Sequence, residues 1–135
     1  MFGYALQAAA DAEGNDDIVE LLLDNHGADG NYVGGTWGTA LQVASEAGFK
    51  SAILLLLSRG ADPNIVAGWH GTALQAAAYR GFRRIVDILL EHGADVDIQG
   101  GARNNAIQAG MEGHDGPNPE LAQFLQSQSK ARTNG

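Results

Sequence analysis

A repeat of 33 residues constrains this chain more than any other feature. The tripeptide GAD begins at Gly27, Gly60 and Gly93, so consecutive copies lie 33 residues apart. A second element, the triplet ALQ or AIQ, returns at nearly the same spacing and begins at Ala5, Ala40, Ala73 and Ala106. A fixed period of this size indicates a stack in which each unit contacts only its neighbours. We place four units at residues 2–33, 34–66, 67–99 and 100–130, with a disordered tail at 131–135.

Each unit has the pattern of two short helices followed by a projecting turn. The first helix begins after Thr39, Thr72 or Asn105, whose side-chain oxygens can accept from the free amides of an opening helical turn. It ends at Gly48 or Gly81, because glycine readily takes the left-handed conformation that closes a helix. The second helix, such as RRIVDILLE, carries its branched apolar residues on one side. The segment between GAD and the next ALQ is rich in glycine, which favours a hairpin-like turn. The prediction is an all-α repeat solenoid.

This 33-residue unit resembles the ankyrin repeat over nearly the whole chain. The family phrase T-P-L-H-x-A corresponds to TALQVA at 39–44 and TALQAA at 72–77, while GAD and I-V-x-x-L-L match directly. The turns GGTWGT and AGWHGT are similar to those in ankyrin arrays of large filamentous-fungal proteins. Where the family has histidine this chain has glutamine, which both donates and accepts. We therefore expect a polar ladder between units, formed by Gln7, Gln42, Gln75 and Gln108.

Charge and composition restrict the partners. Sixteen acidic residues against eight basic ones give a net charge of −8, and the first basic residue is Lys50. This argues against a nucleic-acid partner held through phosphates. The chain has no cysteine, and no apolar run reaches the roughly 20 residues that a membrane helix needs. We expect an intracellular protein, cytoplasmic or nuclear, that needs no cofactor or metal and does not bind membranes.

The resemblance implies that hairpin tips and the late part of each first helix form a concave surface for another protein or peptide. Carried over by repeat position, the candidate partner-binding residues are Trp37, Trp69, His70, Tyr79, Arg80, Arg103, Glu46 and Asp11. Trp37 could contact a partner or pack one hairpin on the next. For Trp69 a functional role is favoured, because its counterparts Thr36 and Ala102 are small. The acidic first unit and the arginines at 80, 83, 84 and 103 would orient a partner of opposite polarity.

A second function remains open at this point. A small molecule could bind in the concave groove, with His70 or Glu46 as acid or base and Tyr79 or Trp37 holding a ring. Against it, the sequence lacks the common catalytic motifs, such as H-E-x-x-H and G-x-S-x-G. His114, beside Asp115 in an irregular loop, is explained by loop polarity. We therefore expect a binding module rather than an enzyme, acting as a monomer or as a piece of a longer array.

Overall fold

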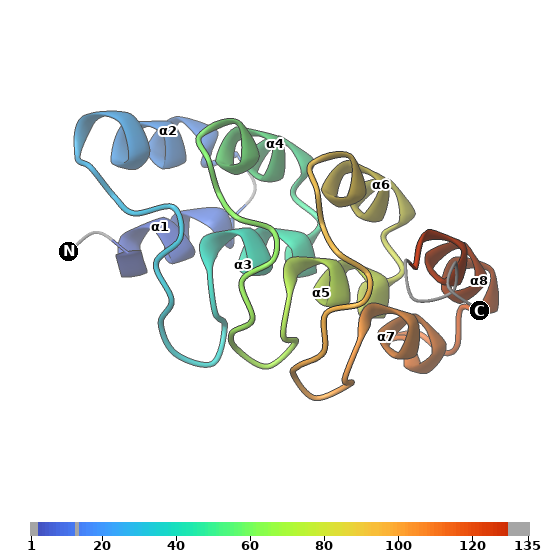
Figure 1. Ribbon diagram of the computed structural model, residues 1–135. Coiled ribbons are helices and arrows are strands. Elements are labelled where there is room, and N and C mark those ends of the chain that lie inside the picture. Colours follow the sequence, from blue (N-terminus) through green and yellow to red (C-terminus); the bar gives the residue numbers. More distant parts are fainter. Residues whose placement is uncertain (1–2, 13, 130–135) are drawn as a thin grey trace.

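The computed structural model describes residues 3–12 and 14–129, so the tail expected at 131–135 lies outside the described part (Figure 1). Its helices are α1 (Gly3–Ala10), α2 (Asp16–Asn25), α3 (Ala40–Ala47), α4 (Lys50–Ser58), α5 (Ala73–Arg80), α6 (Arg83–Glu91), α7 (Ala106–Glu112) and α8 (Pro119–Gln128). Figure 1 shows α1, α3, α5 and α7 side by side in one layer, with α2, α4 and α6 in a second. The predicted helical solenoid is confirmed.

The helix boundaries follow from the capping residues that the sequence places there. Thr39 and Thr72 each accept a hydrogen bond from the amide three residues later, with N to Oγ1 distances of 3.2 Å. Asn105 accepts from the amide of Gln108 at 2.8 Å, where the second and third units use threonine. Gly48 and Gly81 close α3 and α5 with φ of 82° and 76°, in the left-handed region that favours glycine.

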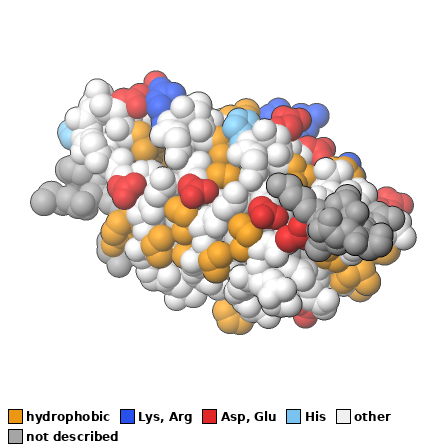
Figure 2. All heavy atoms as spheres, viewed as in Figure 1, with side chains coloured by type: hydrophobic (Ala, Val, Ile, Leu, Met, Phe, Trp, Pro, Cys, Tyr) orange, Lys and Arg blue, Asp and Glu red, His pale blue; other side chains and the backbone are white. Residues whose placement is uncertain are grey.

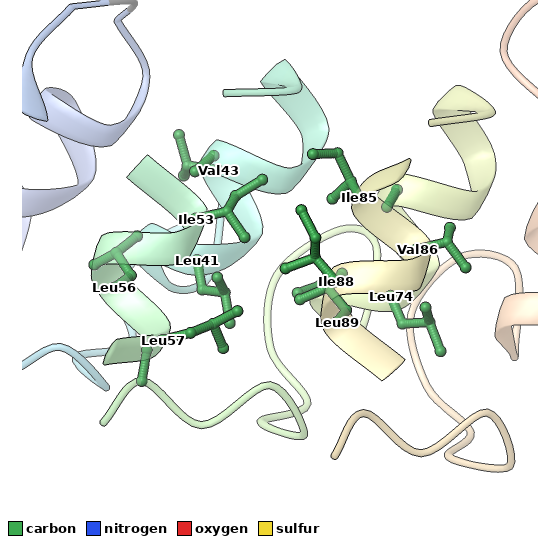
Figure 3. Close-up of a cluster of buried hydrophobic side chains, with 14 of the residues drawn as sticks. Leu41, Val43, Ile53, Leu56, Leu57, Leu74, Ile85, Val86, Ile88 and Leu89 are labelled. Carbon is green, nitrogen blue, oxygen red and sulfur yellow. The ribbon is translucent and has the colours of Figure 1, made fainter. Parts of the chain in front are cut away.

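The core lies within the helix pairs and between neighbouring units. Figure 3 shows apolar side chains meeting between α3 and α4 and between α5 and α6, among them the buried Leu41, Ile53, Leu56, Leu74, Val86 and Leu89. Helix α5 lies between α3 and α7, and its Ala76, Ala77 and Ala78 are completely buried. Small side chains there let the inner helices approach closely and fill the space without voids.

The expected glutamine ladder is present at Gln7, Gln42 and Gln75 but not at Gln108, whose side chain is exposed in the last unit. Gln42 donates from Nε2 to the carbonyl oxygens of Ala67 at 2.9 Å and Gly71 at 2.7 Å, both in the next hairpin. Gln75 repeats this contact one unit later, donating to Gly100 O at 2.7 Å. Gln7 donates to the carbonyls at both ends of the first hairpin. The inner helices α1, α3 and α5 thus each hold the hairpin of the following unit through the side-chain amide of a buried glutamine, so these hairpins have fixed positions beneath the helices.

A second ladder joins the loops that follow the outer helices. Asp62 accepts from the amide of Asn64 at 2.9 Å, and Asn64 in turn accepts from the amide of Asp95 at 2.8 Å in the next unit. Asp29 and Asn31 make the same contacts one unit earlier. In Figure 2 acidic side chains recur across the middle of the visible face. The aspartates of GAD therefore belong to the scaffold, as local acceptors in turns.

Candidate functional site

The hairpin tips are joined to one another through the main chain. The amide of Trp69 donates to Thr36 O at 2.8 Å, and the amide of Ala102 donates to Trp69 O at 2.9 Å. These bonds use backbone atoms, so they do not require a particular side chain. Trp37 remains 63% exposed and Trp69 54% exposed. Packing of one hairpin on the next therefore leaves much of each indole ring in contact with solvent.

Tyr79, at the end of α5, lies at the centre of an aromatic and cationic cluster. The guanidinium carbon of Arg103 lies 3.7 Å from the Tyr79 ring centroid and 5.7 Å from that of Trp69. The ring of His70 lies 5.7 Å from that of Tyr79, on the hairpin before α5. His114 meets Tyr79 edge-on at 5.8 Å, and its amide donates to Tyr79 O at 2.6 Å. We call these five residues the Tyr79 cluster; they come from the third and fourth units.

Carboxylates on the inner helices neutralise the cations around this cluster. Arg80 Nη1 lies 3.4 Å from Glu46 Oε1, and His70 Nε2 lies 4.0 Å from the same oxygen. Arg103 Nε lies 3.9 Å from Glu112 Oε2. The ion pairs join α3 to α5 and the fourth hairpin to α7. On this face, both arginines of the later units that the structure describes, Arg80 and Arg103, therefore have an acidic partner.

The expected group of four arginines is divided by the fold. Arg83 lies on α6 in the outer layer, pairs with Asp87 at 3.1 Å, and places its guanidinium carbon 3.6 Å from the ring centroid of Phe124 on α8. Arg84 is also on α6. Neither belongs to the hairpin and inner-helix face, because residues 83 and 84 open an outer helix. The basic half of the expected charge gradient is therefore reduced to Arg80 and Arg103, each with an acidic partner.

His70 has a buried side chain, with 11% of its side-chain surface exposed. Burial lowers the pKa of His70; the carboxylate of Glu46 opposes this, while Arg103 and Arg80 add to it. Its Nδ1 atom is buried without a hydrogen-bond partner among the described residues. The imidazole is therefore neutral near pH 7, and it fills space between α3 and α5 rather than facing solvent.

An open groove runs between α1 and α3 beside the first hairpin. It has a volume of about 310 Å³ and is lined by Gln7, Ala8, Asp11, Trp37, Val43 and Glu46. We call it the acidic groove, because two carboxylates stand on its sides. A second hollow of about 410 Å³ lies near the ends of α5 and α7, where Tyr79, Arg80 and His114 contribute to its lining.

The family model described as Ankyrin repeats (3 copies) matches residues 6–100 and, in a second match, residues 41–132. The chain belongs to the ankyrin-repeat family. No curated protein sequence matches it. Ankyrin repeats are in general protein-interaction modules and are typically not catalytic. Within residues 3–12 and 14–129, no helix has the length and apolar character needed to cross a membrane.

The ankyrin stack brings most of the predicted site residues together. Six of them form one connected group, in contact through rings and ion pairs: Glu46, Trp69, His70, Tyr79, Arg80 and Arg103. Asp11 and Trp37 lie apart from that group and share the acidic groove with Glu46. The contact of His114 with Tyr79 was not predictable from the sequence, because nothing in one irregular loop indicates that it returns to the end of α5.

Proposed function

We propose that this ankyrin domain binds a protein or peptide partner through the face made by its hairpin tips and inner helices. The observation that carries the proposal is the exposure of Trp37 and Trp69, at 63% and 54%, on hairpins tied together by their main chains. Tryptophan and arginine are the residues that most often dominate interface energies. Large apolar rings on the surface of a rigid scaffold are typical of an interaction site.

In this proposal the site residues have different tasks. Trp37 and Trp69 contact the partner directly, since their rings are the accessible ones. His70, Tyr79 and Arg103 support Trp69 from beneath, because they are packed against one another and Arg103 reaches its ring. Glu46 and Asp11 provide acidic groups at the first-unit end. The partner surface is thus preorganised, which reduces the ordering cost of binding.

A capture experiment with matched variants tests the proposal. The double variant Trp37→Ala/Trp69→Ala is compared with Ile18→Ala/Leu21→Ala, which removes two apolar side chains of α2 that are 47% and 46% exposed. We expect proteins captured from a lysate by the unchanged domain to be retained by the α2 variant and lost with the tryptophan variant. Urea denaturation of each variant shows whether it remains folded. Equal capture by both folded variants contradicts the proposal.

Catalysis in the concave groove has less support. Of the two groups considered as acid or base, His70 lines neither the acidic groove nor the hollow beside His114, and its side chain is 11% exposed. Glu46 lines the acidic groove but is paired with Arg80 at 3.4 Å. A general base must come within hydrogen-bond reach of the proton that it takes. We therefore propose a role in binding rather than catalysis.

We further propose that the domain acts inside the cell, as a monomer or within a longer array, and binds neither nucleic acid nor membranes. A net charge of −8 disfavours phosphate-rich partners, and a chain without cysteine is compatible with a reducing compartment. The likeness of the turns to fungal ankyrin arrays stays a prediction.

A further inference from the structure

Three equivalent spaces lie between successive inner helices, and the chain fills only two of them with its own groups. The residue at the same position of each hairpin is Trp37, His70 or Arg103, spaced by 33 residues. His70 occupies the space between α3 and α5, and the side chain of Arg103, 17% exposed, occupies the one between α5 and α7. Trp37 instead stays 63% exposed and leaves a groove of about 310 Å³.

From this comparison we infer that the acidic groove binds an arginine side chain of the partner peptide. The inference rests on the proposed function and deepens it by naming the partner's chemistry. In the last of the three spaces the chain supplies an arginine itself, because Arg103 lies between the ring of Tyr79 and the carboxylate of Glu112. In the acidic groove the partner supplies the equivalent guanidinium.

The lining of the acidic groove is complementary to an arginine side chain. Ala8 and Val43 provide apolar surface for the methylene stem, and the Trp37 ring provides a face for the guanidinium. Asp11 provides one carboxylate, and Glu46, which also pairs with Arg80 at 3.4 Å, provides a second. Asp11 has no ion-pair partner within residues 3–12 and 14–129, so its charge is available to a ligand. An acidic side chain would instead meet two like charges there.

The same combination of ring and carboxylate surrounds an arginine elsewhere in this molecule. Arg83 lies 3.6 Å from the centroid of Phe124 and 3.1 Å from Asp87. Arginine fits this combination better than lysine, because its planar guanidinium stacks on rings and presents several donors at once. The acidic groove has the ring of Trp37 and the carboxylate of Asp11, unpaired among the described residues, and no arginine is among those that line it. Charge complementarity therefore selects a basic segment as its occupant.

A titration followed by NMR tests the inference on the full chain, with the ¹⁵N-labelled protein and the capped peptide acetyl-Gly-Arg-Gly-amide. We expect saturable shifts of the Trp37 indole N–H and of the Ala8 and Val43 amides, with affinity in the millimolar range, as for a single anchored side chain. Peptides with citrulline or glutamate in place of arginine are the controls, and neither should produce these shifts. Citrulline has nearly the same shape without the charge, so equal shifts with it overturn the inference.

Matched variants separate local recognition from overall charge. Asp11→Asn should weaken the arginine peptide about threefold, as expected for loss of one exposed ion pair. Glu91 is an exposed residue of α6 in the outer layer, so Glu91→Gln removes one negative charge far from the groove and should leave the affinity unchanged. Equal weakening by both variants overturns the inference, because it shows attraction by net charge alone.

The titration and the capture experiment fail independently. Arginine-dependent shifts at Trp37 support the inference even when no captured protein depends on the tryptophans, in which case only the proposed function falls. Absence of these shifts up to about 20 mM peptide, well above the millimolar affinity expected, overturns the inference even when capture depends on the tryptophans.

Discussion

Arg103 stacks on Tyr79, with its guanidinium carbon 3.7 Å from the ring centroid. The Nε and Nη1 atoms of Arg103 are buried and have no hydrogen-bond partner among the described residues. Its nearest carboxylate, that of Glu112, lies 3.9 Å away. The arginine therefore contributes chiefly by packing against the aromatic ring, and its buried donors offset part of that gain.

Replacing Arg103 distinguishes packing from hydrogen bonding. Arg103→Met keeps much of the apolar stem and removes the unpaired donors, so the free energy of unfolding should change by less than about 1 kcal/mol. Arg103→Ala also removes the stem that packs on Tyr79 and should cost about 1.5–3 kcal/mol. Urea denaturation measures both. A loss with methionine as large as with alanine would show that the charge itself is required.

Gln42 and Gln108 occupy the same position of the repeat in different surroundings. Gln42 donates to Gly71 O at 2.7 Å and accepts from the amide of Thr39 at 2.7 Å, whereas the side chain of Gln108 is exposed. Gln42→Ala leaves buried backbone groups unpaired and should lower the free energy of unfolding by about 2–3 kcal/mol. Gln108→Ala should change it by less than about 0.5 kcal/mol. Equal losses in denaturation experiments would contradict a ladder between units.

His70 should make stability depend on pH. Burial lowers its pKa in the folded chain below the ordinary value of 6.5, so the unfolded chain binds more protons in mild acid. This contribution is fully present at neutral pH and is lost as the pH falls below about 6.5 towards the folded pKa. His70→Gln should remove this component of the pH dependence, measured as the free energy of unfolding at several pH values. The same slope in the variant would exclude His70 as its source.

Arg59 links the outer helices of the first two units. Its Nε lies 2.9 Å from Asp24 Oδ1 and its Nη2 lies 3.1 Å from Glu20 Oε1, both on α2. The pairs are exposed, so Arg59→Gln should destabilise the protein at low salt and have little effect at about 1 M salt, where screening is strong. Urea midpoints at the two salt concentrations test this. A deficit that persists in high salt would indicate a packing role.

The repeat made most of the fold predictable. Thr39, Thr72 and Asn105 cap helices by accepting from amides three residues later, so this role can be recognised from the local sequence. Because the period is fixed, the pattern of one unit then predicts that of the next. Arg59 shows the limit of that reasoning. A cation just before GAD, at the end of an outer helix, fits an interaction with the helix dipole, but nothing in that position indicates that its ion pairs reach the neighbouring unit. Contacts between units depend on rotation and separation, which the period does not give.

Repeat position predicted which residues belong to the candidate site, but not which of their side chains are exposed to solvent. Repeat position indicated that Trp37, His70 and Arg103 are equivalent, but Trp37 is 63% exposed, whereas the side chains of His70 and Arg103 are only 11% and 17% exposed. The difference depends on the opposing helix: Tyr79 offers a ring against which His70 and Arg103 pack. Which of the equivalent residues is exposed is therefore decided by its neighbours in space.

The bonds from Trp69 N to Thr36 O and from Ala102 N to Trp69 O also have an evolutionary consequence. Every residue has a carbonyl and every residue except proline an amide, so selection for folding at the hairpin tips acts mainly on atoms that most substitutions preserve. If the proposed function holds, selection for recognition acts on the exposed rings of Trp37 and Trp69. The two pressures therefore largely separate at these positions, and the tips of such a stack can change their ligand by single substitutions while the stack itself persists.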